Sequence, residues 1–132
     1  MARGLVGDAR SDGKPHPAWA DYTHRGNGER VVDAHANDLR HAPEGGWFEW
    51  DGKRWAPDPG SKRALKRAMD TLVAMALEAR TSPGLDADDH KFIERSQSPG
   101  EWGSALTTAS LYAPIATSFD AFDDGRDAPK GH

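Results

Sequence analysis

The sequence contains no cysteine and no long apolar run. A chain without cysteine has no disulfide framework, no thiolate zinc site and no cysteine nucleophile. No stretch approaches the roughly 20 apolar residues that a membrane-crossing helix needs, and the first eight residues, MARGLVGD, lack the apolar core of a signal peptide. We therefore expect a cytoplasmic protein without a membrane partner.

Aliphatic side chains are also scarce. Leu, Ile, Val and Phe make up about 14% of the 132 residues, below the roughly 20% under which disorder becomes a concern. Disordered chains, however, combine low hydropathy with high net charge. Here the formal net charge is only -4, and five tryptophans add large apolar surface. The sequence therefore predicts one small domain with a modest core. Its pI of about 5.8 argues against a globally basic nucleic-acid binder but allows a local basic patch.

The distribution of glycine and proline sets the expected domain boundaries. Residues 1–20 and 120–132 are rich in Gly, Pro and charged residues without apolar periodicity. We expect a flexible, disordered tail at each end, the second one acidic. Residues 21–119 then form the folded domain. Gly and Pro clusters divide this domain into short elements, and no internal repeat is visible.

Four helices are expected in this domain. The first follows Asn27 as N-cap and ends at Asn37-Asp38. The third follows Asp86, with Asp89 three residues later. The fourth is opened by Ser98-Pro99-Gly100-Glu101, which combines a capping box with proline at the first helical position.

The second and longest helix follows Pro59-Gly60, with Ser61 as N-cap, and continues to about Arg80. Its apolar residues recur at three- and four-residue intervals, which is typical of one buried stripe. That stripe comprises Leu65, Met69, Leu72, Met75, Ala76 and Ala79, with Val73 and Leu77 widening it.

The aromatic segment between the first two helices predicts a β-hairpin. Asp51-Gly52 is a favoured two-residue type I′ loop between aromatic strands. Pairing outward from this loop gives three cross-strand pairs, namely Trp50 with Lys53, Glu49 with Arg54 and Phe48 with Trp55. The three aromatic residues of these pairs then share one face, which we expect to pack against helices because an isolated hairpin is marginally stable. Trp47 falls on the charged face.

The segment before the hairpin, residues 39–42, is expected to be a short extended piece, since Ala42 precedes Pro43 and is biased away from helix. The predicted fold class is therefore mainly α. It is a small helical domain with one β-hairpin at residues 47–55 and flexible N- and C-terminal tails.

The sequence does not match the common catalytic and ligand-binding motifs. Gly7 and Gly13-Lys14 are one residue too far apart for a phosphate loop, and Pro15 stands where a Mg²⁺-binding hydroxyl is required. In a calcium loop from Asp120, Phe122 would occupy a ligand position. None of the six histidines forms an i, i+4 zinc pair, and no serine has a nucleophile-elbow context. We name no catalytic residue, no metal site and no cofactor.

The charge pattern between Trp47 and Arg67 is less ordinary. Six basic residues stand against three acidic ones in this segment of an acidic chain. Four of the cations fall in the first two turns of the long helix, where they repel one another and oppose the helix dipole. Three interpretations stay open: a solvated face, a contact with nucleic-acid phosphates and a contact with an acidic protein. The candidate nucleic-acid-binding residues are Lys53, Arg54, Lys62, Arg63, Lys66, Arg67 and Trp47, whose ring is either core or a base-stacking platform.

Several segments follow one another in a distinctive order. GNGERVV at 26–32 leads into NDLR at 37–40, and GWFEWDGKRW at 46–55 precedes the long helix. A segment with Ser96 and Ser98 opens another helix, and Phe119-Asp120 follows. In this order they resemble the domain that precedes the superfamily 3 helicase in phage and plasmid primases, a group related to the poxvirus helicase-primase. The resemblance covers roughly residues 21–120, and the Trp-x-x-Trp-Asp-Gly-x-x-Trp hairpin is its most specific part.

The resemblance implies a role in DNA replication. In that family a primase-polymerase domain lies upstream and a hexameric ATPase ring downstream. The intervening domain is mainly helical, forms a collar at the helicase entrance and helps to assemble the ring, and the family pattern assigns it no catalytic residue. The implied partners are a superfamily 3 helicase ATPase or a primase domain in another chain, together with single-stranded DNA. The implied location is the cytoplasm of a bacterial or phage-infected cell.

The sequence departs from the family after Phe119-Asp120. There the family continues into a strand-rich element and the ATPase, whereas this chain continues with AFDDG and ends at His132. Helicase activity is therefore not expected of these residues. We expect a non-catalytic replication module, either as a truncated gene product or as the partner of a separately encoded ATPase. The alternative is a stand-alone protein-interaction domain that has lost its replication context.

Overall fold

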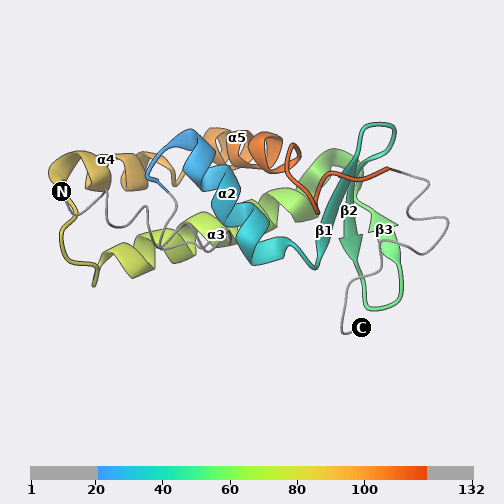
Figure 1. Ribbon diagram of the computed structural model, residues 1–132, viewed down its shortest axis with the longest axis horizontal. Helices are drawn as coiled ribbons and strands as arrows, with labels where there is room; N and C mark the ends of the chain where they lie inside the picture. Colours follow the sequence, from blue (N-terminus) through green and yellow to red (C-terminus); the bar gives the residue numbers. More distant parts are fainter. Residues whose placement is uncertain (1–20, 119–132) are drawn as a thin grey trace.

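A computed structural model describes residues 21–118, which form four α-helices and one three-stranded sheet (Figure 1). The two predicted tails lie outside the described residues. In chain order the elements are α2 (His24–His35), β1 (Leu39–Ala42), β2 (Gly46–Trp50), β3 (Trp55–Pro57), a short 3-10 turn η1 (Pro59–Ser61), α3 (Lys62–Ala79), α4 (Ala87–Arg95) and α5 (Pro99–Ala109). The predicted mainly α fold class is confirmed.

The helix α3 is the longest element and extends from the sheet at one end of the molecule to α4 at the other (Figure 1). Helices α2 and α5 pack on it and on each other. The core between them is made of aliphatic and small side chains, with Trp47 as its one buried tryptophan among the described residues. Its fully buried members are Val31, Leu39, Ala64, Ala68, Leu72, Ala105, Ala109 and Ile115.

The helix starts follow local capping chemistry. The predicted N-cap residues of α4 and α5 are confirmed, because Asp86 accepts the amide of Asp89 and Ser98 accepts the amide of Glu101. The reciprocal bond of the capping box predicted for α5 is not among its described hydrogen bonds, since the Glu101 carboxylate bonds Asn27 and His24. The predicted cap of the first helix is wrong. Thr23 caps α2 by accepting the amide of Gly26, so Asn27 lies inside the helix and is fully buried.

The sheet has the order β1-β2-β3 and is antiparallel throughout. The expected extended piece at residues 39–42 is strand β1, which pairs with β2 and so adds one strand to the predicted hairpin. The predicted hairpin register is wrong by two residues. Trp50 pairs with Trp55 across a four-residue loop, in which the Asp51 carboxylate accepts the amides of Lys53 and Arg54 at 2.8 and 2.9 Å. These two bonds stabilise the wider loop, because they satisfy amides that a two-residue turn would place in the ladder.

The face of the hairpin that meets the helices is the opposite of the predicted one. Trp47 is only 8% exposed and belongs to the helical core together with Leu39 of β1. Phe48, Trp50 and Trp55 share the other face, as predicted. Phe48 is 6% exposed, and the two tryptophans are half-buried with their ring centroids 5.3 Å apart. Both faces of β2 carry aromatic side chains, so the sequence pattern alone does not indicate which face packs against the helices.

The buried stripe of α3 is narrower than predicted and rich in alanine. Leu72, Met75 and Ala79 are buried as expected, whereas Val73 and Leu77 are 42% and 54% exposed, so their assignment to the core is wrong. The rest of the buried side is made of small residues, namely Ala64, Ala68 and Thr71. No helix among residues 21–118 combines the length and the apolar character needed to span a membrane.

Two glycines allow α2 to lie close to its neighbours. A Cβ on Gly28 would come within 2.4 Å of the Thr108 side chain in α5, and one on Gly26 within 1.8 Å of the backbone oxygen of Asp21. Because real Cβ contacts are longer, any side chain at these positions forces the elements apart. The glycines of the segment GNGE therefore serve close packing of α2 against its neighbours.

We expect Trp47→Ala to lower the free energy of unfolding by about 3–5 kcal/mol, as for other buried aromatic truncations, because its ring joins the sheet to the helical core. Chemical denaturation would measure this loss. Leu77→Ala, at an exposed position, is the control and should change stability by no more than about 0.5 kcal/mol. Equal effects of the two substitutions would contradict this packing.

We expect Gly28→Ala to destabilise the fold by about 1–3 kcal/mol, the usual cost of overpacking. Gly100→Ala is the matched control in α5, because a Cβ there meets nothing within 4 Å, and it should be neutral or stabilising by up to about 1 kcal/mol. Thermal or urea unfolding of both variants measures the difference. If both alanines have the same effect, α2 and α5 do not pack this closely.

Candidate nucleic-acid interface

The start of α3 is organised by the carboxylate of Asp58. Its oxygens accept the backbone amides of Arg63 and Ala64 at 3.2 and 2.8 Å, while its own amide donates to the carbonyl of Trp47 at 2.9 Å. The predicted cap, Ser61, has a left-handed φ of 60° and makes no side-chain cap. Asp58 is 7% exposed, so a nearly buried anion compensates the positive end of the helix.

A second anion, Glu49 of β2, connects the sheet to α3. Its Oε2 lies 2.9 Å from both Nε and an Nη of Arg67, and its Oε1 lies 4.0 Å from Arg63. The side chain of Glu49 is only 14% exposed. The hydrogen bond from Arg67 to Glu49 raises the pKa of the guanidinium. Arg67 therefore has a structural partner, and Glu49 does not pair with Arg54 as the hairpin prediction required.

The four predicted cations of α3 lie together along one shallow, open groove. The groove is lined by Glu49, Lys62, Arg63, Lys66, Arg67 and Asp70, and so carries four cations against two anions. Lys66 pairs with Asp70 at 3.1 Å. Lys62 is exposed, and Arg63 is 62% exposed, with the long contact to Glu49 as its one ion pair within the described part of the chain. The uncompensated charge of the groove is therefore concentrated at Lys62 and Arg63.

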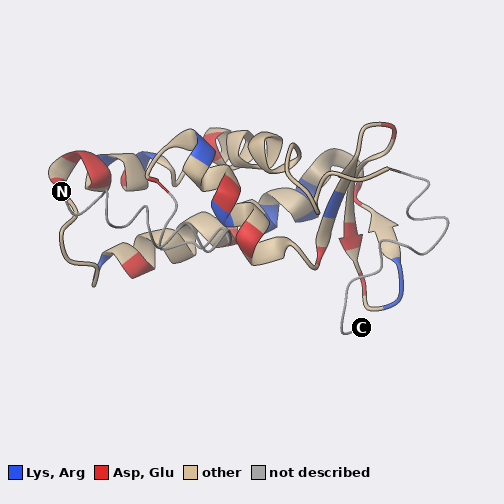
Figure 2. Ribbon diagram, in the orientation of Figure 1, with Lys and Arg blue, Asp and Glu red and all other residues tan. Residues whose placement is uncertain are grey.

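The other two predicted cations are elsewhere. Lys53 and Arg54 lie on the exposed loop between β2 and β3, at the end of the sheet away from the start of α3 (Figure 2). Arg54 is 3.9 Å from Asp51 in the same loop. The six cations thus form two separate patches.

Trp47 does not face either patch. Its ring is 8% exposed and lies 5.0 Å from the ring of His41, edge to face. A base can stack only on an accessible ring face, so we leave Trp47 out of the candidate interface.

A buried polar cluster, not found from the sequence, joins α2 to the beginning of α5. The Asn27 amide donates to Ser96 at 3.1 Å and to the Glu101 carboxylate at 3.2 Å, and the exposed His24 bonds the same carboxylate at 2.7 Å. Asn27 and Ser96 are at most 1% exposed. The signal for this cluster is an asparagine between two glycines in a segment with helical periodicity. Its chemistry is that of a specific helix contact.

A hydrogen-bonded chain of Asp38, His35 and Thr71 has the order of a catalytic triad. The two ring nitrogens of His35 lie 3.1 Å from Asp38 and 3.1 Å from the Thr71 hydroxyl. That hydroxyl, however, donates to the carbonyl of Arg67 at 2.8 Å in the middle of α3, and Thr71 is 9% exposed. A nucleophile needs an open approach for the substrate and a hydroxyl proton directed at its base, and the Thr71 hydroxyl has neither. The three residues instead form a structural connection between the end of α2 and α3.

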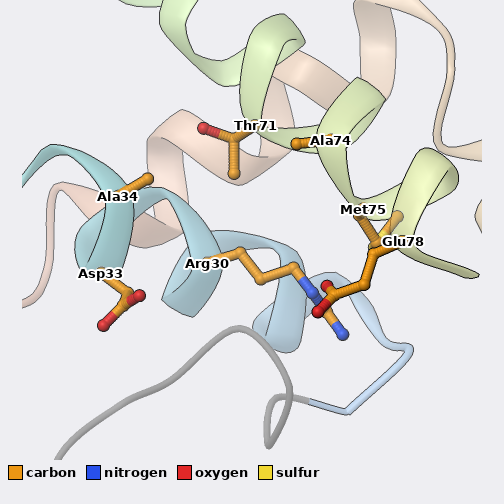
Figure 3. A pocket seen from close by; sticks show the side chains of 7 residues that line it. All are labelled: Arg30, Asp33, Ala34, Thr71, Ala74, Met75 and Glu78. Atoms are coloured by element: carbon orange, nitrogen blue, oxygen red, sulfur yellow. The ribbon is translucent and has the colours of Figure 1, made fainter. Parts of the chain in front are cut away.

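A hollow between α2 and α3 is lined by Arg30, Asp33, Ala34, Thr71, Ala74, Met75 and Glu78 (Figure 3). Arg30 of α2 and Glu78 of α3 point toward each other across it. The guanidinium of Arg30 donates to the carbonyl of Asp21 at 2.8 Å and lies 4.9 Å from the centre of the Tyr22 ring. Burial lowers the pKa of Arg30, and the charge of Glu78 is among those that oppose the shift. Arg30 therefore fixes the segment before α2.

Metal ligands do not gather in the described part of the chain. No three His, Asp or Glu side chains among residues 21–118 come together in an arrangement that could hold a metal ion.

Protonation of Asp38 should weaken the fold. Although burial raises its pKa, the hydrogen bond and charge of His35 and the charge of Arg67 hold the pKa of Asp38 below its ordinary value. A depressed carboxyl pKa contributes stability above the unfolded-state pKa of about 3.9, and the contribution is lost as pH falls through the folded-state value. At about pH 6, Asp38→Asn should cost less than about 1 kcal/mol, because the side chain is 36% exposed.

Urea midpoints at about pH 6 and about pH 2.5 measure this difference, which should nearly vanish at the lower pH. Glu44→Gln, in the exposed turn between β1 and β2, is the control without an effect at either pH. If the difference in urea midpoint between Asp38→Asn and the wild type stays constant with pH, the charge of the Asp38 carboxylate does not contribute to stability.

Comparison with known proteins gives one family. A family model described as D5 N terminal like matches residues 28–128, about three quarters of the chain. No curated protein and no solved structure is significantly similar to the chain. The matched range runs from the middle of α2 through α5 and includes all six candidate cations, which confirms the resemblance seen in the sequence. The chain therefore belongs to the D5 N-terminal-like family, the N-terminal domain of D5-type primase-helicases.

Proposed function

We propose that this domain is a non-catalytic module of a phage- or plasmid-type DNA replication primase-helicase. It assists assembly with a superfamily 3 helicase ATPase or a primase domain carried by another chain, in the cytoplasm. It also contacts DNA through the groove beside α3. Membership of the D5 N-terminal-like family supports the replication context.

The observation that carries the DNA contact is the exposed pair Lys62 and Arg63 at the start of α3. Both cations stand at the positive end of a helix, where they do not favour helix formation, and a buried anion, Asp58, compensates that end. Because these two exposed cations do not stabilise the helix, we infer that they bind an external anion. Phosphates of a nucleic-acid backbone are such anions.

The remaining groove residues support this contact less directly. Arg67 and Lys66 each have a carboxylate partner, Glu49 and Asp70. They add positive potential, and each would have to share its carboxylate partner in order to contact a phosphate. Among residues 21–118, the groove lining contains no aromatic ring, so we expect a contact with the backbone that is independent of base sequence.

The salt dependence of DNA binding tests this proposal. Affinity for a fluorescein-labelled oligo(dT) is measured by anisotropy at several salt concentrations, for the full chain and for Lys62→Ala/Arg63→Ala. Each phosphate contact to single strands adds about 0.7 to the slope of log K against log salt. The double variant should therefore bind more weakly and lose about 1.4 units of slope.

Lys91→Ala/Arg95→Ala is the matched control, because it removes two exposed cations from α4 and changes the net charge by the same amount. It should keep the wild-type slope. A second variant, Lys53→Ala/Arg54→Ala, tests the loop patch separately. An unchanged slope in Lys62→Ala/Arg63→Ala, or an equal loss in the α4 control, would rule out the groove as the DNA contact.

A further inference from the structure

The outer side of α3 carries an apolar pair that no described element covers. Val73 and Leu77 are 42% and 54% exposed and lie one turn apart, on the side of α3 opposite its buried residues. An exposed aliphatic residue alone is ordinary, but two in adjacent turns make a continuous apolar surface. Ala74, also exposed, and Ala76, half-buried, flank the pair and would let another helix approach closely.

Charged residues bracket this apolar pair on the same side of the helix. Asp70 lies one turn before Val73 and has a 44% exposed side chain. Arg80 follows Leu77 by three residues and is exposed. Within residues 21–118, Arg80 has no carboxylate partner, whereas Asp70 accepts a hydrogen bond from Lys66 and has lone pairs left for a second cation.

The order of these residues is complementary to itself in the antiparallel direction. If two α3 helices lie antiparallel with their centres at Met75, Val73 comes to the level of the partner's Leu77, and Asp70 to the level of the partner's Arg80. Each relation occurs twice, as a two-fold axis requires. An acidic–apolar–apolar–basic order has this property, and a parallel pair would place like charges together.

We propose that the outer side of α3 is a docking surface for a second copy of this chain, in an antiparallel, two-fold symmetric contact. Four aliphatic side chains form its centre, and two Asp70–Arg80 pairs flank them. This proposal does not rest on the DNA contact. Lys62 and Arg63 lie two turns of the helix before Asp70, which lines the basic groove as well, so the contact reaches one end of each groove and not these two cations.

The size of the surface sets the strength of the contact. A single 18-residue helix offers less than the roughly 800 Å² per partner of a standard stable interface. We therefore expect a weak dimer, whose population rises with concentration over the micromolar to submillimolar range.

Sedimentation equilibrium of the full chain from about 10 to about 500 µM tests this proposal. The weight-average mass should rise toward that of a dimer. Leu77→Asp should raise the dissociation constant by about tenfold or more, because it places two carboxylates in an apolar centre. Leu111→Asp is the matched control, since Leu111 is 74% exposed outside α3, and it should dimerise like the wild type.

Charge exchange tests the antiparallel register. Asp70→Arg and Arg80→Asp should each weaken the dimer several-fold, because each opposes like charges twice, and the double variant should recover most of the wild-type affinity. Circular dichroism checks that all variants are folded. A chain that stays monomeric at every concentration, a dimer insensitive to Leu77→Asp, or a double variant without recovery would overturn the proposal. A monomer that binds a different protein through this side would also do so.

Discussion

The carboxylate of Asp58 determines where α3 begins, and the position of the whole basic groove depends on it. It accepts two free amides of the helix, and its own amide is bonded to β2 at Trp47. The same residue therefore sets the start of the helix and its distance from the sheet. Glu49 fixes the orientation through Arg67. Two nearly buried anions thus hold a row of cations that would otherwise repel one another and the helix dipole.

Elements governed by neighbouring residues could be predicted from the sequence. The caps at Asp86 and Ser98 are examples, since a capping hydrogen bond spans only three residues. The hairpin shows the limit of such reasoning. Asp51-Gly52 suits a two-residue turn, but the Asp51 side chain equally stabilises a four-residue loop. The face that packs inward was then decided by a third strand, because Leu39 adds to the apolar surface around Trp47.

The candidate site was predictable to the same extent. The four cations of α3 are close in sequence on a helix, so their proximity followed from helical geometry. The distance of Lys53 and Arg54 from them depends on the direction of the sheet, which is a tertiary property. Asn27 bonds Ser96, 69 residues away, and no local pattern indicates that partner. In place of a cap, the segment GNGE supplies Gly28, which lies against Thr108 of α5 with no room for a side chain.

The alanines on the buried side of α3 have a thermodynamic consequence. Ala64, Ala68 and Ala79 each bury little hydrocarbon, and several polar residues of the domain, among them Arg30 and Asn27, are buried as well. Exposure of apolar surface raises the heat capacity of the unfolded chain, whereas exposure of polar surface lowers it. We therefore expect the heat-capacity increment of this domain to fall below the usual value of about 12–15 cal/mol/K per residue. Its stability then has a shallow temperature optimum, and warming or cooling a cell by a few tens of degrees changes the folded fraction gradually.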